Sequence, residues 1–243
     1  MSGHSKWANI KNKKEKTDAH RGKIFTKIGR EIAIAVKEGG GADPANNSKL
    51  RDVIAKAKAN NLPNDNINRS IKKAAGEGSS VNYEEITYEG YGPSGVAVIV
   101  ETATDNRNST AGELRHYFDK FGGNLGQSGC VGFMFSDRGV IAISNEDGDV
   151  DADKLMEDAL EAGASDFTDD GDVLEIQTEP DDLSAVRDAL AAKGYEFISA
   201  EIEKVPSSYI KLENEEDIRY MNLLLEHLDD NEDVQNVWHN WEE

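Results

Sequence analysis

The spacing of the apolar residues changes once along this chain, at the glycine- and serine-rich segment 76–80. Before this segment the apolar residues recur every three or four positions, which is typical of amphipathic helices. After it, short runs of β-branched and other apolar residues alternate with helical patterns, which indicates strands alternating with helices. The change of spacing therefore predicts a helical first part and an α+β remainder, joined by a short linker.

Three helices are expected in the first part. The first begins near Asp18 and ends at the three glycines 39–41, because glycine commonly terminates a helix. In the second, Asp43 is the expected N-cap and Pro44 the first helical residue. The third opens at Pro63 and ends before the linker. Each pattern has one apolar face, so the three helices are expected to form a small bundle.

The remainder is expected to contain two α/β domains. Strands are predicted at 96–100, 131–135, 209–212 and 234–238, with helices at 114–121 and 218–228. Between these halves, residues 138–205 show the order βαββαβ of a ferredoxin-like unit. The expected fold class is α+β: an N-terminal three-helix bundle followed by two ferredoxin-like α/β domains, one inserted in the other. The expected domains are 1–78, then 79–137 together with 206–243, and the inserted domain 138–205.

Charge is divided unequally between the two parts of the chain. Residues 1–80 hold 17 Lys and Arg against 8 Asp and Glu, a net charge of +9. Residues 81–243 hold 10 against 39, a net charge of −29. A basic head on an acidic body indicates a polyanionic partner for the head. The acidic α/β domains are in turn a candidate surface for a protein partner.

The predicted nucleic-acid interface combines an N-terminal arm with outward cations of the helices. Residues 1–17 show no apolar period, so the arm is expected to become ordered only on a partner. Trp7 suits stacking on a base, and amides such as Asn9 can bind phosphates or base edges. The alternative is a solubilising tail, the usual role of a short charge run. The predicted contacts are His4, Ser5, Lys6, Trp7, Asn9, Lys11, Lys13, Lys14, Lys16, Arg21, Lys23, Lys27, Arg30, Arg69, Lys72 and Lys73.

A second candidate contact joins a predicted strand to a predicted helix. It consists of Asp105, Asn106, Arg107 and Asn108. One interpretation is a helix cap, with Asn108 or Ser109 as the capping residue. The other is an anion site, because a helix N-terminus beside an arginine favours negative charge. Spacing alone favours the cap.

Signals for catalysis, metal binding and membrane insertion are weak or missing in the sequence. No nucleophile elbow, zinc-protease or phosphate-loop motif occurs, so no catalytic residue, metal site or cofactor is predicted. The single cysteine cannot form an internal disulfide. No apolar run is long enough to span a membrane, and no secretory signal is visible. The expectation is a cytoplasmic, monomeric protein.

Several long strings in the sequence resemble the YebC family. They are GHSKWANIK at 3–11, KIF at 23–25, REI at 30–32, LPNDNI at 62–67, YEGYGP at 88–93 and TDNRN at 104–108. The resemblance runs from residue 3 to the C-terminus and is densest over 3–135. Ser109 stands where the family commonly has arginine, and Cys130 stands where it commonly has serine, which argues against a required thiol.

The resemblance implies a three-domain, non-enzymatic protein that binds nucleic acid. The family includes mitochondrial translational activators of cytochrome c oxidase subunit I. Its members are described as ribosome-associated factors that relieve stalling at proline-rich stretches, and also as probable transcriptional regulators that bind DNA. Three hypotheses stay open: a translation factor that binds ribosomal RNA or tRNA, which is favoured, a DNA-binding regulator, and a hydrolase with a site between the α/β domains. Against DNA, no clear helix-turn-helix recognition helix is evident in the head sequence.

Overall fold

The computed structural model describes residues 18–76 and 82–242. These residues form two compact units, one of residues 135–205 and one of the remainder. Three separate apolar cores lie in the helical head, in the sheet that follows it and in the inserted unit. The predicted fold class is confirmed: the chain is α+β, with a helical head and two α/β domains, one inserted in the other. None of the described helices is both long and apolar enough to cross a lipid bilayer.

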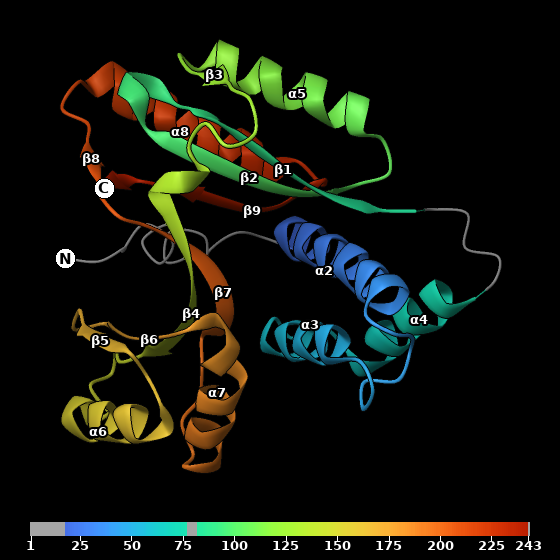
Figure 1. The fold of residues 1–243 in the computed structure, drawn as a ribbon, viewed down its shortest axis with the longest axis vertical. Helices are drawn as coiled ribbons and strands as arrows, with labels where there is room; N and C mark the ends of the chain where they lie inside the picture. Colours follow the sequence, from blue (N-terminus) through green and yellow to red (C-terminus); the bar gives the residue numbers. More distant parts are fainter. Residues whose placement is uncertain (1–17, 77–81, 243) are drawn as a thin grey trace. The chain divides into compact units, whose positions relative to one another are not determined.

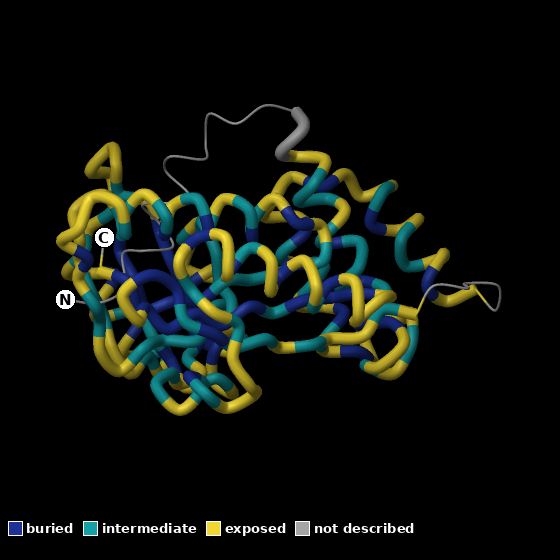
Figure 2. The backbone as a smooth tube through the Cα atoms, turned by 90° about the horizontal axis from the view of Figure 1, so that it is seen from above, coloured by how far each residue is buried: buried dark blue, intermediate teal, exposed yellow. Residues whose placement is uncertain are grey.

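The head consists of α2 (Asp18–Glu38), α3 (Ser48–Ala59) and α4 (Asn64–Ala75), as Figure 1 shows. Ile28, Ile32 and Leu50 lie at the centre of its core and are at most 1% exposed. Along each helix, the less exposed residues recur every three or four positions, with exposed residues between them. Figure 2 shows the backbone coloured by burial. The three predicted helices are therefore confirmed, and one face of each remains available for other contacts.

The start of α3 differs from the prediction. Asp43 and Pro44 lie in a turn, and the N-cap is Asn47, whose side chain accepts a hydrogen bond from the Leu50 amide at 2.9 Å. The Asn47 side chain is fully buried and also donates to the Ala35 carbonyl oxygen at 2.7 Å. It therefore caps α3 and fastens it to α2, a tertiary role that local sequence signals do not reveal.

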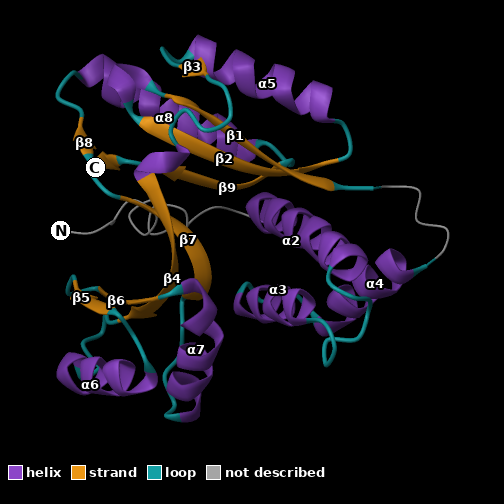
Figure 3. Ribbon diagram, viewed as in Figure 1, coloured by secondary structure: helices purple, strands orange, loops and turns teal. Residues whose placement is uncertain are grey.

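The second domain is a four-stranded sheet covered by two helices. The strands are β1 (Glu84–Tyr91), β2 (Ala97–Thr104), β3 (Asn124–Leu125) and β9 (Val234–His239), in the order β3-β1-β2-β9. The helices α5 (Arg107–Lys120) and α8 (Glu215–Asp230) bury Leu114 and Met221 against Val98 of β2. Figure 3 shows these helices beside the sheet. The short strands β8 (Ile210–Lys211) and β10 (Trp241–Glu242) form a separate parallel pair.

The strand predicted at 131–135 is wrong. The chain forms a 3-10 turn at Gly132–Met134, and the next strand begins at Phe135. The Glu89 carboxylate accepts hydrogen bonds from the amides of Gly129, Val131 and Gly132 at 2.7–2.9 Å, so these amides are not available to a strand ladder. The neighbours of β1, a largely polar strand, are instead β2, with which it pairs along its whole length, and the short edge strand β3.

The inserted unit has the predicted order βαββαβ. Its elements are β4 (Phe135–Ser144), α6 (Ala152–Ala162), β5 (Asp166–Asp169), β6 (Val173–Thr178), α7 (Leu183–Ala192) and β7 (Ser199–Pro206). The antiparallel sheet has the strand order β5-β6-β4-β7, which is the ferredoxin-like arrangement. Ile141 and Ile176 face α6 and α7 and form the core with Leu155 and Leu190.

Glu175 of β6 points to the other face of this sheet, since its neighbours Leu174 and Ile176 belong to the core. It is 8% exposed. Burial raises the pKa of its carboxyl to about 7, the hydrogen bond from Gln177 lowers it, and the nearby Glu203 carboxylate raises it. A carboxyl in this environment favours its protonated form near neutral pH.

Replacing Glu175 with glutamine is expected to stabilise the inserted unit increasingly as the pH rises. The folded carboxyl keeps its proton up to about pH 7, whereas an unfolded one loses it near its ordinary pKa of about 4.3. The stability conferred by the raised pKa is therefore complete below pH 4.3 and lost as the pH rises to about 7. Glu175→Gln should gain up to about 3 kcal/mol relative to native between pH 5 and pH 8, measured by denaturant unfolding.

Glu196→Gln is the control, because Glu196 is exposed in the same unit. This variant should gain less stability than Glu175→Gln at pH 8. A Glu175→Gln difference that does not change with pH would contradict the buried, protonated carboxyl.

Candidate nucleic-acid interface

The basic face of α2 lies against an acidic segment of the second domain. Lys23, Lys27 and Arg30 are spaced four and three residues apart, so they share one face of the helix. They meet residues 229–233, which comprise the end of α8 and the turn before β9 and carry Asp229, Asp230, Glu232 and Asp233. The sequence analysis predicts these three cations as contacts for nucleic acid, and the structure places them in contacts within the chain.

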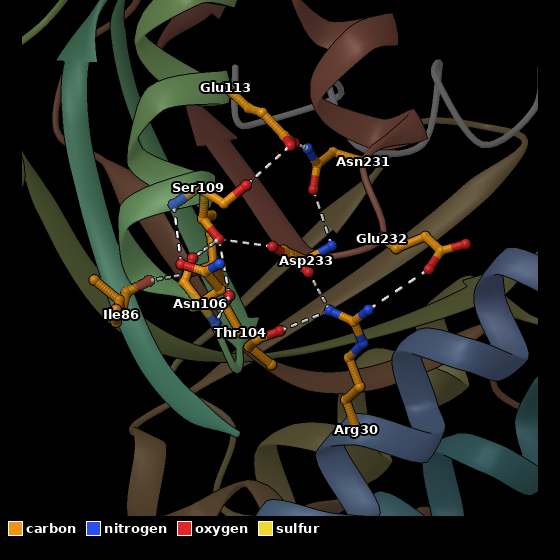
Figure 4. A network of polar contacts seen from close by, with 12 residues as sticks. Arg30, Ile86, Thr104, Asn106, Ser109, Glu113, Asn231, Glu232 and Asp233 are labelled. Carbon is orange, nitrogen blue, oxygen red and sulfur yellow. Dashed lines mark hydrogen bonds and ion pairs between the residues drawn. The ribbon is translucent and has the colours of Figure 1, made fainter. Parts of the chain in front are cut away.

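Arg30 makes the innermost of these contacts (Figure 4). Its guanidinium pairs with the Asp233 carboxylate, donates to the Ala103 carbonyl oxygen at 3.0 Å and lies 3.5 Å from Glu232. Its side chain is only 13% exposed, and it lies over the ring of Tyr83, 5.1 Å from the ring centroid. An arginine with this many partners is held in place and is not a free surface cation.

Asp233 connects this arginine to the start of α5. Its carboxylate also accepts from the Thr110 hydroxyl at 2.6 Å, and its carbonyl oxygen accepts from the Ala103 amide at 2.8 Å. Burial alone would raise the pKa of Asp233, but the hydrogen bonds from Thr110 and Arg30 outweigh it, so the pKa lies below its usual value. Asp233 therefore joins α2 and α5 through its carboxylate and the end of β2 through its carbonyl oxygen. Figure 4 draws the contact with Arg30.

The outer contacts of α2 are more exposed. Lys23 Nζ lies 2.8 Å from Asp230 Oδ1, and Lys27 Nζ donates to the Asp229 carbonyl oxygen at 2.7 Å. The Lys23 and Asp230 side chains are 37% and 58% exposed. The hydrogen bond to Asp230 is the main cause of the raised pKa of Lys23. The Lys23–Asp230 contact is a solvent-accessible ion pair of the kind that contributes little to stability.

Further exposed cations of the head lie on α3 and α4. Arg69, Lys72 and Lys73 of α4 are exposed and lie opposite its buried residues Ile67 and Ala74. Their spacing places them on one face, as the sequence predicts. A structural alternative applies to Lys72 and Lys73, which lie in the last turn and complement the helix dipole.

Helix α3 adds two exposed cations that sequence reasoning missed. Arg51 and Lys58 are seven residues apart and therefore share one face of the helix. Within residues 18–76 and 82–242, no acidic group pairs with Arg51, Lys58, Arg69, Lys72 or Lys73. Their placement on the outward side of α3 could be inferred from the buried position of Leu50 and Ala57. We refer to these five residues as the α3–α4 cation surface.

The remaining predicted contacts are those of the N-terminal arm and Arg21. The contacts in the arm lie outside the described residues: His4, Ser5, Lys6, Trp7, Asn9, Lys11, Lys13, Lys14 and Lys16. Arg21 is exposed near the start of α2. The structure therefore gives geometry for the helical part of the predicted interface only.

The segment 105–108 forms the start of α5, and all four residues are exposed. The N-cap is Asn106, whose side chain accepts from the Ser109 amide at 3.2 Å, so the prediction of Asn108 or Ser109 as the cap is wrong. The Asn106 amide donates to the Thr104 hydroxyl at 2.9 Å, which fixes the turn before the helix. Arg107 is the first helical residue, and its carbonyl oxygen accepts from the Tyr88 hydroxyl at 3.2 Å.

Among the described residues, no group of three or more His, Cys, Asp or Glu side chains could hold a metal ion. Cys130 is half-buried, and burial raises the pKa of its thiol, as does the Glu89 carboxylate nearby. This environment disfavours the thiolate form that a nucleophile needs.

Comparison with known proteins gives consistent matches along the chain. Residues 5–77 match the family model described as TACO1/YebC protein N-terminal domain, and residues 83–241 match TACO1/YebC second and third domain. Two relatives that are 64% identical are named probable transcriptional regulatory protein. The one from Acetivibrio thermocellus aligns over 99% of both chains, and the one from Ruminiclostridium cellulolyticum over 100% of this chain and 97% of its own.

The fold matches a solved structure as well. The crystal structure of a conserved hypothetical protein from Aquifex aeolicus superposes with a TM-score of 0.88 at 44% identity, covering 98% of this chain and 97% of that one.

The inner contact of α2, made by Arg30, is expected to contribute more to the free energy of unfolding than the outer contact, made by Lys23. Arg30→Ala leaves the partly buried Asp233 carboxylate without its cation, so the free energy of unfolding should fall by about 2–3 kcal/mol. Lys23→Ala removes an exposed ion pair and should cost less than about 0.5 kcal/mol. Urea unfolding followed by circular dichroism measures both. Equal effects of the two substitutions would contradict the assignment of Arg30 as the residue that holds α2 in place.

Proposed function

Because the chain belongs to the TACO1/YebC family, we propose that it is a nucleic-acid-binding regulator of gene expression that acts through its head. The observation that carries the proposal is the α3–α4 cation surface. Five exposed cations lie there on two neighbouring helices of a head with an excess of positive charge, whereas the rest of the chain carries −29. A polyanion is attracted to the first part and repelled by the second.

We propose more specifically that the nucleic acid is ribosomal RNA or tRNA and that the protein relieves stalling at proline-rich stretches. Two arguments support this. The sequence resembles a family that includes translational activators, and the acidic body disfavours a nucleic acid that lies along the whole molecule. On the ribosome the head would contact RNA while the acidic domains face basic proteins or solvent. The arm would extend this contact, with Trp7 stacking on a base.

A second candidate is a DNA-binding transcriptional regulator. The names of the relatives support it, and so does the geometry of the head, in which only residues 60–63 separate α3 from α4. Two helices joined by so short a turn, the second with exposed cations, are compatible with placing α4 in the major groove. Crosslinking in cells, followed by sequencing of the bound nucleic acid, distinguishes the two: ribosomal RNA or tRNA reads support the first, and enriched promoter DNA supports the second.

We propose no catalytic role for the protein. The segment 105–108 is instead a second contact, in which Arg107 and the start of α5 bind a phosphate or an acidic partner. A helix N-terminus favours negative charge, and the first turn of α5 holds no acidic residue to satisfy it.

Binding to RNA is expected to depend on the α3–α4 cation surface. In the triple variant Arg69→Glu, Lys72→Glu, Lys73→Glu, affinity for a short labelled RNA should fall at least about 100-fold near physiological salt. The slope of log K against log salt should become shallower by about 2–3, because three phosphate contacts are lost. Fluorescence anisotropy across a KCl series measures both quantities.

The matched control reverses three exposed cations of the acidic domains, Arg115→Glu, Lys154→Glu and Arg219→Glu, which gives the same change of net charge. The control should keep the native slope. Equal losses in the two triple variants would show that net charge, and not this surface, governs binding.

The two interpretations of the segment 105–108 separate in stability and activity. Asn106→Ala removes the cap and should cost about 1 kcal/mol of unfolding free energy. Arg107→Ala should leave stability unchanged and lower the relief of stalling on a proline-rich reporter translated in vitro. Native activity of Arg107→Ala would leave this segment as a helix cap alone.

A further inference from the structure

The contacts of α2 with residues 229–233 have the chemistry of a phosphate contact. A nucleic-acid backbone presents closely spaced phosphate oxygens that carry negative charge. Residues 229–233 likewise present closely spaced oxygens, from carboxylates and from main-chain carbonyl groups. Lys23 meets a carboxylate, Lys27 meets a carbonyl oxygen and Arg30 meets a carboxylate. We propose that residues 229–233 act as an internal competitor that keeps the α2 cations from nucleic acid. The inference rests on the proposed function of the head.

The contacts are graded from the inner to the outer end. Arg30 is 13% exposed, and it contacts both the Ala103 carbonyl oxygen of β2 and the Asp233 carboxylate. Nucleic acid therefore does not easily displace these two partners of Arg30. Lys23 is 37% exposed, and its partner Asp230 is 58% exposed. An ion pair this exposed contributes little to stability, so a polyanion can displace it. The inner contact therefore fixes the head, and the outer contacts set how much of α2 is accessible.

The competition has a consequence for the salt dependence of binding. A free lysine that contacts a phosphate replaces condensed counterions, and their release drives binding. Lys23 must first break its ion pair with the Asp230 carboxylate, and Lys27 must first break its hydrogen bond to the Asp229 carbonyl oxygen. Lys23 and Lys27 should therefore contribute little to the salt slope of the native protein, although the sequence places them on its basic head.

The test neutralises the outer carboxylates in the full chain. Asp229→Asn, Asp230→Asn is compared with Asp119→Asn, Glu213→Gln, which removes the same charge from two exposed positions elsewhere in the second domain. The probe is a short labelled oligouridylate, titrated across a KCl series. Melting temperature monitors the fold, which Arg30 and Asp233 continue to hold.

The expected result is tighter binding by the Asp229→Asn, Asp230→Asn variant, about 5- to 10-fold near physiological salt, with a slope steeper by about 1–1.5. Adding Lys23→Ala and Lys27→Ala should return both quantities to native values. Equal behaviour of variant and control overturns the competition, and so does tighter binding with an unchanged slope. A native protein without salt-dependent binding would instead overturn the proposed function itself, and this inference with it.

Discussion

Of the ion pairs that join the head to the second domain, the one between Arg30 of α2 and Asp233 before β9 has the least exposed partners. The pair is largely shielded from solvent, and Asp233 also accepts a hydrogen bond from Thr110 of α5. Because an unpaired charge in this position would be costly, neither partner can be lost without loosening the other contacts. Opposite charges on the two parts of the chain therefore help to hold the head against the second domain.

This use of charge changes how the basic head is interpreted. A net charge of +9 over residues 1–80 suggests that all of its cations are available. In the structure Lys23, Lys27 and Arg30 contact residues 229–233, and Lys49 pairs with Glu38 and Glu85. The five residues of the α3–α4 cation surface remain exposed. We therefore propose that α3, α4 and the arm contact nucleic acid, whereas α2 attaches the head to the second domain.

The sequence predicts the fold better than it predicts this division. Apolar spacing identifies the three head helices and the βαββαβ order of the inserted unit, because both are local patterns that burial enforces. Apolar spacing fails where the structure of a segment depends on its hydrogen-bond partners. Glu89 takes the amides of the predicted strand at 131–135, and the capping roles of Asn47 and Asn106 depend on hydrogen bonds that several nearby polar residues could make. The partners of α2 lie about two hundred residues further along the chain, and no spacing rule connects them.

The central claim is that nucleic acid contacts the outward faces of α3 and α4 while α2 stays engaged with the second domain. Ultraviolet crosslinking of the full chain to RNA, followed by mass spectrometry of the crosslinked peptides, tests it most directly. The account predicts crosslinks in peptides from residues 48–75 and from the arm, with few in residues 135–205. Crosslinks concentrated in residues 135–205, with none in α3 or α4, would contradict it.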